Sequence, residues 1–166
     1  NAKAAEFHDV LKMGRTENQD AVPMTLGQEF SAYASTIKDG IRYIERAAEE
    51  FLDINMGATA VGTGINSPPG YAELCTMHLS DVSGLRVRIA ENLVQATHDS
   101  GPFSLMSGAM KTAAVQLSKI CNDLRWLSSG PRCGLYEIRL PAMQPGSSIM
   151  PGKVNPVIPE MVSQVR

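Results

Sequence analysis

The stretch QPGSSIMPGKVNP, residues 144–156, gathers the residue types in this chain that could do chemistry. Ser147 and Ser148 follow a glycine, where backbone N–H groups can converge on an anion. Lys153 adds a cation, and Asn155 adds an amide just before a helix-like segment whose N-terminus favours negative charge. These residue types predict a carboxylate site. A mobile active-site lid has a similar composition, and so does an ordinary solvated loop.

The same stretch does not fit a nucleotide-binding phosphate loop. That motif requires GxxxxGK followed by Ser or Thr, between a strand and a helix. Five residues separate Gly146 from Gly152 instead of four, Val154 follows the lysine, and no strand pattern precedes the glycines. We therefore exclude the phosphate loop and keep the carboxylate site, the lid and the solvated loop as alternatives.

Two long helix patterns must position this stretch. The first extends from Thr25 for about thirty residues, well beyond an average helix. Its expected apolar stripe has two lines of residues at seven-residue spacing, namely Phe30, Ile37, Ile44 and Phe51, and beside them Ala34, Ile41, Ala48 and Asn55. Gly40 is the one residue within this segment that disfavours helix formation. Gln19 and Asp20, just upstream, are candidates for a cap of this helix.

The second long helix is predicted over residues 104–130, with Gly130 and Pro131 ending it. Its expected buried face consists of Met110, Ala113, Leu117, Ile120, Leu124 and Leu127. Asp123 and Arg125 on this helix are read as an ion pair or a cap. The length of both helices indicates packing in a bundle.

Shorter elements complete the pattern. A glycine-rich turn over 56–70 precedes a helix that Gly84 ends, and residues 86–101 predict an extended piece followed by a helix. Prolines keep 131–156 in loops, and a last helix is expected to start at Pro156 with Asn155 as its N-cap. Strand signals are scarce, so the predicted fold class is all-α, a long-helix bundle.

Composition narrows the functional classes. A formal net charge of −2 gives no reason to expect nucleic acid or an anionic membrane as a partner. No apolar run approaches the ~20 residues that span a bilayer. Three cysteines without CxxC spacing favour a reducing compartment, so a cytoplasmic protein is expected. His8, His78 and His98 lack metal-ligand spacing, and we predict no metal and no organic cofactor.

GSSIMPGKVNP resembles the signature loop of the fumarase/aspartase superfamily of lyases. GRTENQDAVPMTLGQEF at 14–30 resembles the second signature region, GATAVGTGIN at 57–66 the turn after the first long central helix, and SKICNDLRWLSSGPRCGLYEI at 118–138 matches as well. The resemblance implies that residues 1–166 are a partial chain, the central helical-bundle domain, without the N-terminal domain and the C-terminal small domain. It also implies a homotetramer that shares one helical bundle.

Within the superfamily the segments VPMTLGQEF and AENLVQATHDSG look more like aspartases than class II fumarases. That resemblance implies an ammonia-lyase that converts L-aspartate, a small dicarboxylate, to fumarate and ammonia. A fumarase-type hydratase acting on malate and a non-catalytic helical oligomerisation module are the alternatives. The family site combines three signature regions from three subunits, and the first region does not occur in residues 1–166. We therefore expect the isolated segment to be inactive.

The resemblance also assigns roles to residues. Ser147 matches the general base that removes the C3 proton and generates an aci-carboxylate intermediate, which Ser148 would hydrogen-bond. Lys153 and Asn155 match the pair that holds the other carboxylate, and Thr16 matches a further carboxylate contact.

Glu17 departs from the family pattern, which typically carries His or Gln at that position as a substrate-positioning residue. Glu160 matches the acid that usually partners it. Two facing carboxylates repel each other unless a cation lies between them. A substrate ammonium could be that cation, which would favour aspartate over malate. The alternative is that Glu17 turns outward into solvent.

Overall fold

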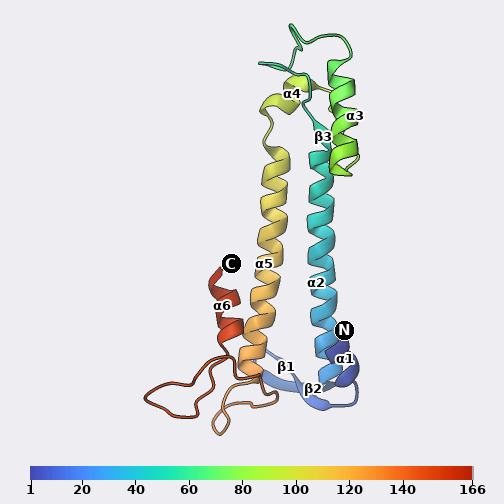
Figure 1. Ribbon diagram of the computed structural model, residues 1–166. Coiled ribbons are helices and arrows are strands. Elements are labelled where there is room, and N and C mark those ends of the chain that lie inside the picture. Colours follow the sequence, from blue (N-terminus) through green and yellow to red (C-terminus); the bar gives the residue numbers. More distant parts are fainter. Residues whose placement is uncertain (166) are drawn as a thin grey trace. The chain divides into compact units, whose positions relative to one another are not determined.

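A computed structural model describes residues 1–165. The chain forms two compact units. The hairpin unit comprises Asn1–Ile41 together with the chain from Lys111 onward, and the turn unit comprises Arg42–Met110. Helices dominate both units (Figure 1). Among the described residues, no helix is long and apolar enough to cross a membrane.

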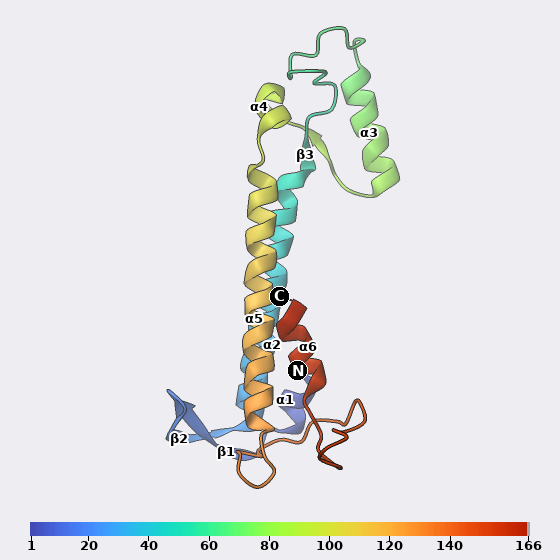
Figure 2. The same ribbon diagram turned by 90° about the vertical axis from the view of Figure 1, so that its left-hand side faces the viewer.

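The elements confirm the all-α, long-helix prediction. The two long helices are α2, Leu26–Glu49, and α5, Gly101–Leu127. The shorter elements are α1 (Ala2–Glu6), β1 (Leu11–Thr16), β2 (Gln19–Thr25), the 3-10 turn Glu50–Leu52, β3 (Asp53–Ile54), α3 (Tyr71–Ser83), β4 (Arg88–Ile89), α4 (Leu93–His98) and α6 (Val157–Val165). In the hairpin unit, both views show the C-terminal half of α5 beside the N-terminal half of α2 (Figures 1 and 2).

The β1–β2 hairpin was not predicted from the sequence. Its strands are antiparallel, and Gln19 and Asp20 lie in β2 instead of capping a helix. Glu17 and Asn18 form the two-residue turn with φ of 52° and 60°. Such turns need positive φ at both positions and usually contain glycine. The TEN sequence has none, so the usual hairpin signal is missing.

The buried face of α2 is displaced from the predicted stripe. Leu26, Tyr33, Gly40 and Ala47 are buried, again at seven-residue spacing. The predicted line of Phe30, Ile37, Ile44 and Phe51 is half-buried beside it. The second predicted line is wrong at three of its four positions, since Ile41 is 53% exposed and Ala48 and Asn55 are exposed as well, whereas Ala34 is half-buried.

Close approach explains this displacement. A Cβ at Gly40 would lie only 2.6 Å from Oε1 of Gln116 on α5, so the position predicted to weaken α2 is one at which α5 packs against it. An apolarity pattern does not identify a glycine as an interface residue, although small residues allow helices to approach closely.

The predicted buried face of α5 is confirmed only toward the C-terminal end of the helix. Leu127 is buried at 3% exposure, but Leu117 is 43% and Met110 is 59% exposed. Ser118 is the most buried side chain of the helix instead. One chain contains too few helices to enclose every apolar face of α5, so these side chains remain open to solvent.

Most predicted helix ends agree with the structure. Gly84, with φ of 70°, ends α3, and its N–H donates to the carbonyl of Ser80. The extended piece and the helix of 86–101 appear as β4 and α4, and residues 131–156 form neither helix nor strand. The last helix begins at Val157, one residue later than predicted, so Asn155 is not its N-cap.

The glycine-rich turn has the close approach that its sequence predicts. Gly57, Gly62 and Gly64 all have positive φ, at 78°, 90° and 70°. A Cβ at Gly62 would lie 2.3 Å from the Cα of Val94, where α4 begins. Backbone therefore packs on backbone at this position, and no rotamer change can make room for a side chain.

Comparing Gly62→Ala with Gly70→Ala tests this packing. Gly70 also has a positive φ of 78°, but a Cβ there would meet nothing within 4 Å. We expect Gly70→Ala to lower the free energy of unfolding by about 1 kcal/mol from backbone strain alone. Gly62→Ala should lower it by more than about 3 kcal/mol, because steric overlap with backbone is added. Urea denaturation measures both, and equal losses would contradict the backbone contact.

Candidate active site

The serine loop, residues 144–156, is a folded loop between α5 and α6. A Cβ at Gly146 would lie 2.6 Å from the carbonyl oxygen of Lys153, so the two arms of the loop touch at its base. Ser147 is half-buried, and its Oγ accepts a hydrogen bond of 3.3 Å from the N–H of Ile149. The N–H of Lys153 donates to the carbonyl of Met150 at 3.1 Å. These contacts define the loop more closely than an ordinary solvated connector requires.

The other predicted residues of this region lie on the same loop and the helix after it. Ser148 and Lys153 are exposed, whereas Asn155 is half-buried at the entry to α6. Glu160 lies in the first turn of α6, is half-buried, and donates its N–H to the carbonyl of Pro156 at 3.1 Å. Serine hydroxyls, an ammonium and an amide therefore share one short segment at a helix N-terminus.

Thr16 and Glu17 belong to a different element. Both are exposed where β1 ends and the hairpin turn begins. Within residues 1–165, no hydrogen bond or ion pair joins either of them to the serine loop or to Glu160. Glu17 is therefore exposed to solvent in this chain, and Glu17 and Glu160 of the same chain do not face each other.

A half-buried group of charges was missed entirely by sequence reasoning. We name Lys12, Arg15, Glu29 and Glu137 the hairpin cluster. Nζ of Lys12 lies 2.5 Å from Oε2 of Glu29 and 3.3 Å from Oε2 of Glu137, and Nη2 of Arg15 lies 2.5 Å from Oε1 of Glu137. The members come from β1, from the start of α2 and from the segment after α5. No spacing rule connects such distant positions.

The charges in this cluster determine the ionisation of Glu137. Burial opposes ionisation, but the Arg15 hydrogen bond and the charges of Lys12 and Arg15 outweigh it and hold the pKa of Glu137 below its usual value. Glu137 is therefore a carboxylate at neutral pH. The same bond raises the pKa of Arg15 against the opposing effect of burial.

Tyr33 extends this network to α5. Its hydroxyl lies 3.1 Å from Oε1 of Glu29 and 3.1 Å from Oδ2 of Asp123. Asp123 forms an ion pair with Lys119, one turn earlier on α5, which agrees with the prediction for Asp123. Arg125, the other residue of that prediction, instead donates from Nη1 to Oδ1 of Asn122 at 3.3 Å. Burial, followed by the two neighbouring carboxylates, raises the pKa of Tyr33. The phenol stays neutral and can donate to either acid.

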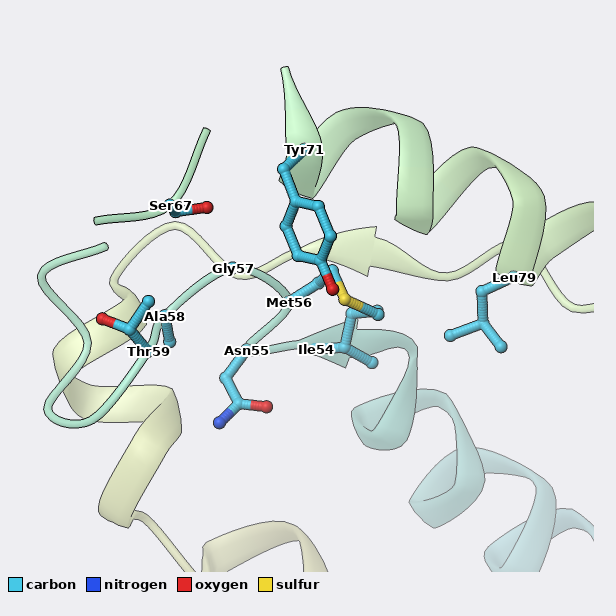
Figure 3. A pocket seen from close by; sticks show the side chains of 9 residues that line it. All are labelled: Ile54, Asn55, Met56, Gly57, Ala58, Thr59, Ser67, Tyr71 and Leu79. Atoms are coloured by element: carbon cyan, nitrogen blue, oxygen red, sulfur yellow. The ribbon is translucent and has the colours of Figure 1, made fainter. Parts of the chain in front are cut away.

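The turn unit has a pocket of about 450 Å³, but none of the predicted site residues lines it. Its polar groups come from Asn55, Thr59, Ser67 and Tyr71. Figure 3 shows the Tyr71 ring reaching from the start of α3 toward Met56, while the Asn55 amide points away from that ring. The lining has no charged side chain and so offers nothing that could neutralise a dicarboxylate.

Metal-ligating residues do not gather in the described part of the chain. Residues 1–165 contain no group of three or more His, Cys, Asp or Glu that could hold a metal ion. Cys75, Cys121 and Cys133 are all free.

Comparison with known proteins gives the family. The sequence profile of the lyase family matches residues 1–166. The chain belongs to the lyase family. Its relatives place this member in the fumarase/aspartase superfamily that the serine loop resembles.

Curated relatives of this chain are named aspartate ammonia-lyase. The protein of Escherichia coli strain K12 is 58% identical over 163 residues, which are 98% of this chain and 34% of that protein. The protein of Pseudomonas aeruginosa is 60% identical over 165 residues, 99% of this chain and 35% of that protein. The chain thus spans about a third of the length of the relatives it matches.

Solved structures share the fold of this chain. The cobalt-bound structure described as fumarate lyase:delta crystallin from Brucella melitensis has a TM-score of 0.95 and 57% identity, covering 99% of this chain and 36% of that one. Recombinant class II fumarase from Schistosoma mansoni also has a TM-score of 0.95, with 39% identity over 99% of this chain and 37% of that one. The chain therefore shares its fold with both of these proteins.

Replacing Tyr33 by Phe tests the extended network. Loss of hydrogen bonds to charged groups should lower the free energy of unfolding by about 1–2 kcal/mol at pH 7. The pKa of Tyr33 is higher in the folded chain, so its stabilisation is complete below the unfolded value near 10 and is lost as pH rises further. Denaturation at increasing pH should therefore show a shallower alkaline decline in Tyr33→Phe.

Tyr43→Phe on α2 is the matched control. Tyr43 is 38% exposed, and within residues 1–165 its hydroxyl has no described hydrogen bond. The Tyr43→Phe variant should show the same free energy of unfolding and the same alkaline decline as the unmodified chain. Identical alkaline declines in Tyr33→Phe and the unmodified chain would contradict the placement of Tyr33 between Glu29 and Asp123.

Proposed function

We propose that this chain contributes active-site segments to a cytoplasmic ammonia-lyase that converts L-aspartate to fumarate and ammonia. The observation that carries the proposal is the 58–60% identity to proteins named aspartate ammonia-lyase over nearly the whole chain. The contacts of the serine loop support it, since they keep serine, lysine and asparagine on one folded segment.

The proposed chemistry begins at Ser147. Its Oγ, as the alkoxide, takes the proton from C3 of aspartate, and the electrons of the broken C–H bond move into the adjacent carboxylate to form the aci-carboxylate. The C2–N bond then breaks, ammonia leaves, and the C2–C3 double bond of fumarate forms. Donation from the N–H of Ile149 supports the negative charge on Ser147, because a fixed donor stabilises an oxyanion without reorganisation.

The remaining residues bind the dicarboxylate. Ser148 hydrogen-bonds the aci-carboxylate, while Lys153 and Asn155 hold the other carboxylate. Lys153 is exposed and so is free to meet an incoming anion. Thr16 adds a carboxylate contact, and Glu17 with Glu160 receives the ammonium group of the substrate. This chain supplies no cofactor-dependent step.

Thr16 and Glu17 reach a serine loop only if another copy provides it, and we propose a homotetramer with a shared helical bundle. The exposed apolar side chains of α2 and α5 support this, including Ile41, Met110 and Leu117. Apolar patches of this kind are typical of surfaces that associate. Neither nucleic acid nor membrane is a proposed partner.

A hydratase acting on malate is the second candidate. The observation in its favour is the 39% identity and TM-score of 0.95 with the Schistosoma mansoni class II fumarase. Higher identity to the aspartate ammonia-lyases favours the amino acid substrate. A non-catalytic oligomerisation module is the remaining outcome.

Ser147→Ala in the protein that carries this chain tests the catalytic role. We expect kcat for aspartate to fall by about 10²–10⁴, the range for loss of a general base, with assembly unchanged. Fumarate absorbance measures turnover, and light scattering measures assembly. Ser104→Ala is the control, because Ser104 is exposed on α5. Retained turnover in Ser147→Ala would remove the catalytic assignment, and no turnover of aspartate or malate in the unmodified protein would favour the oligomerisation module.

Glu17→Gln tests the substrate preference. If Glu17 receives the substrate ammonium, this change should lower kcat/KM for aspartate by about tenfold, the effect of losing one charge-assisted hydrogen bond. Turnover of malate, which has no ammonium group, should not fall. Steady-state assays with both substrates give the ratio, and an unchanged ratio would mean that Glu17 simply faces solvent.

A further inference from the structure

The hairpin cluster partly buries four charges that the proposed reaction does not use. Exposure is 8% for the Lys12 side chain, 20% for Glu29, and 19% for both Arg15 and Glu137. Taking charges out of water is unfavourable unless they are paired and hydrogen-bonded. Replacing such a cluster with apolar residues is often neutral for stability, so stability alone is a weak explanation for it.

The element that depends on the cluster is the hairpin. An isolated two-stranded hairpin is only marginally stable, and most residues of β2 are exposed. Strict alternation along β1 would direct Lys12 and Arg15 to opposite faces. The register shifts by one residue between Gly14 and Arg15, which leaves Ala21 unpaired in β2. A bulge of this kind increases the local twist of the strands. In the twisted hairpin the side chains of Lys12 and Arg15 both reach Glu137.

Glu137 itself is held by the end of α5. Its N–H donates to the carbonyl of Leu127 at 2.9 Å, and Leu127 is 3% exposed. The neighbouring Tyr136 donates its N–H to the carbonyl of Ser129 at 2.9 Å. The carboxylate therefore projects from a backbone held by α5 toward the hairpin.

Arg15 makes the stronger of the two contacts with Glu137. The Lys12 ammonium lies 3.3 Å from Oε2 of Glu137, yet that oxygen has no aligned hydrogen-bond partner. Lys12 thus acts on Glu137 by charge, and Arg15 acts by a directed bond. Arg15 immediately precedes Thr16, so whatever fixes Arg15 also fixes the start of the turn.

We propose that Glu137 is a positioning residue, which through Arg15 and Lys12 holds the hairpin so that Thr16 and Glu17 meet the substrate in one orientation. The inference rests on the proposed function for these two residues. Glu137 does not touch the substrate. Displacing a binding group by about 1 Å can cost 10²-fold in rate, so an anchor outside the site affects the reaction.

The kinetic test uses Glu137→Gln and Glu137→Ala in the protein that carries this chain. We expect KM for aspartate to rise about tenfold in Glu137→Ala, corresponding to one lost charge-assisted hydrogen bond, and less in Glu137→Gln. The kcat should change less than KM, because the contacts of the serine loop remain. Arg15→Gln should raise KM similarly, and the double variant Arg15→Gln/Glu137→Gln should be no worse than Arg15→Gln, since the two residues act as a unit.

The structural test does not depend on activity. Amide hydrogen exchange should accelerate at residues 11–25 in both Glu137 variants and stay unchanged in α3. Asp53→Asn is the matched control, because it breaks the Arg88–Asp53 pair of 2.8 Å in the turn unit. That control should leave both hairpin exchange and KM unchanged. Glu137→Gln preserves side-chain volume and serves if Glu137→Ala folds poorly.

Unchanged hairpin exchange in the Glu137 variants would overturn the proposal. Faster exchange with unchanged KM and kcat would also overturn it, since the hairpin would then not matter to the reaction. Exchange that accelerates equally in the hairpin and in α3 would indicate a general loss of stability, and it would also overturn the proposal. Failure of the proposed function looks different: Ser147→Ala keeps its turnover, while hairpin exchange still responds to Glu137.

Discussion

A carboxylate withdrawn from water must be matched by cations, and Glu137 has two of them on one strand. This requirement determines how the N-terminal part of the chain is arranged. The strand that carries Lys12 and Arg15 must lie against the end of α5, and the turn that follows it must project outward. Because Glu29 takes the other side of Lys12, the start of α2 is fixed by the same charges. Three segments distant in sequence are thereby joined.

The two long helices meet a different constraint. Gly40 lets α5 approach α2 to a distance that no larger residue would allow without displacing Gln116. The faces of α2 and α5 that point away from this contact leave many apolar side chains exposed to solvent, including Ile41 and Leu117. A helix pair alone cannot enclose both stripes. Exposed apolar faces of this kind are typical of long helices that pack in a larger bundle.

Local patterns predicted the helices well because their signals are local. Gly84, for example, ends α3 through its own backbone conformation. The hairpin was missed because Glu17 and Asn18 adopt positive φ without glycine. The contacts that the hairpin makes in the folded chain then outweigh the local conformational preferences of its residues. The stripe on α2 was misplaced because hydrophobicity does not indicate where a glycine permits contact.

The candidate residues show the same division. The serine loop could be identified from its composition and its resemblance to a family, since its parts are adjacent in sequence. Glu137 could not, because its partners at positions 12 and 15 become neighbours only after folding. A charged residue in a loop-rich segment gives no sign of burial in the sequence.

The contact between Gly146 and the carbonyl of Lys153 makes the serine loop a closed ring rather than a pair of free arms. The hydroxyl of Ser147 and the backbone that carries the Lys153 ammonium therefore lie on one closed segment. In the proposed reaction, the group that binds a substrate carboxylate and the group that takes the proton are thus held by the same short piece of backbone.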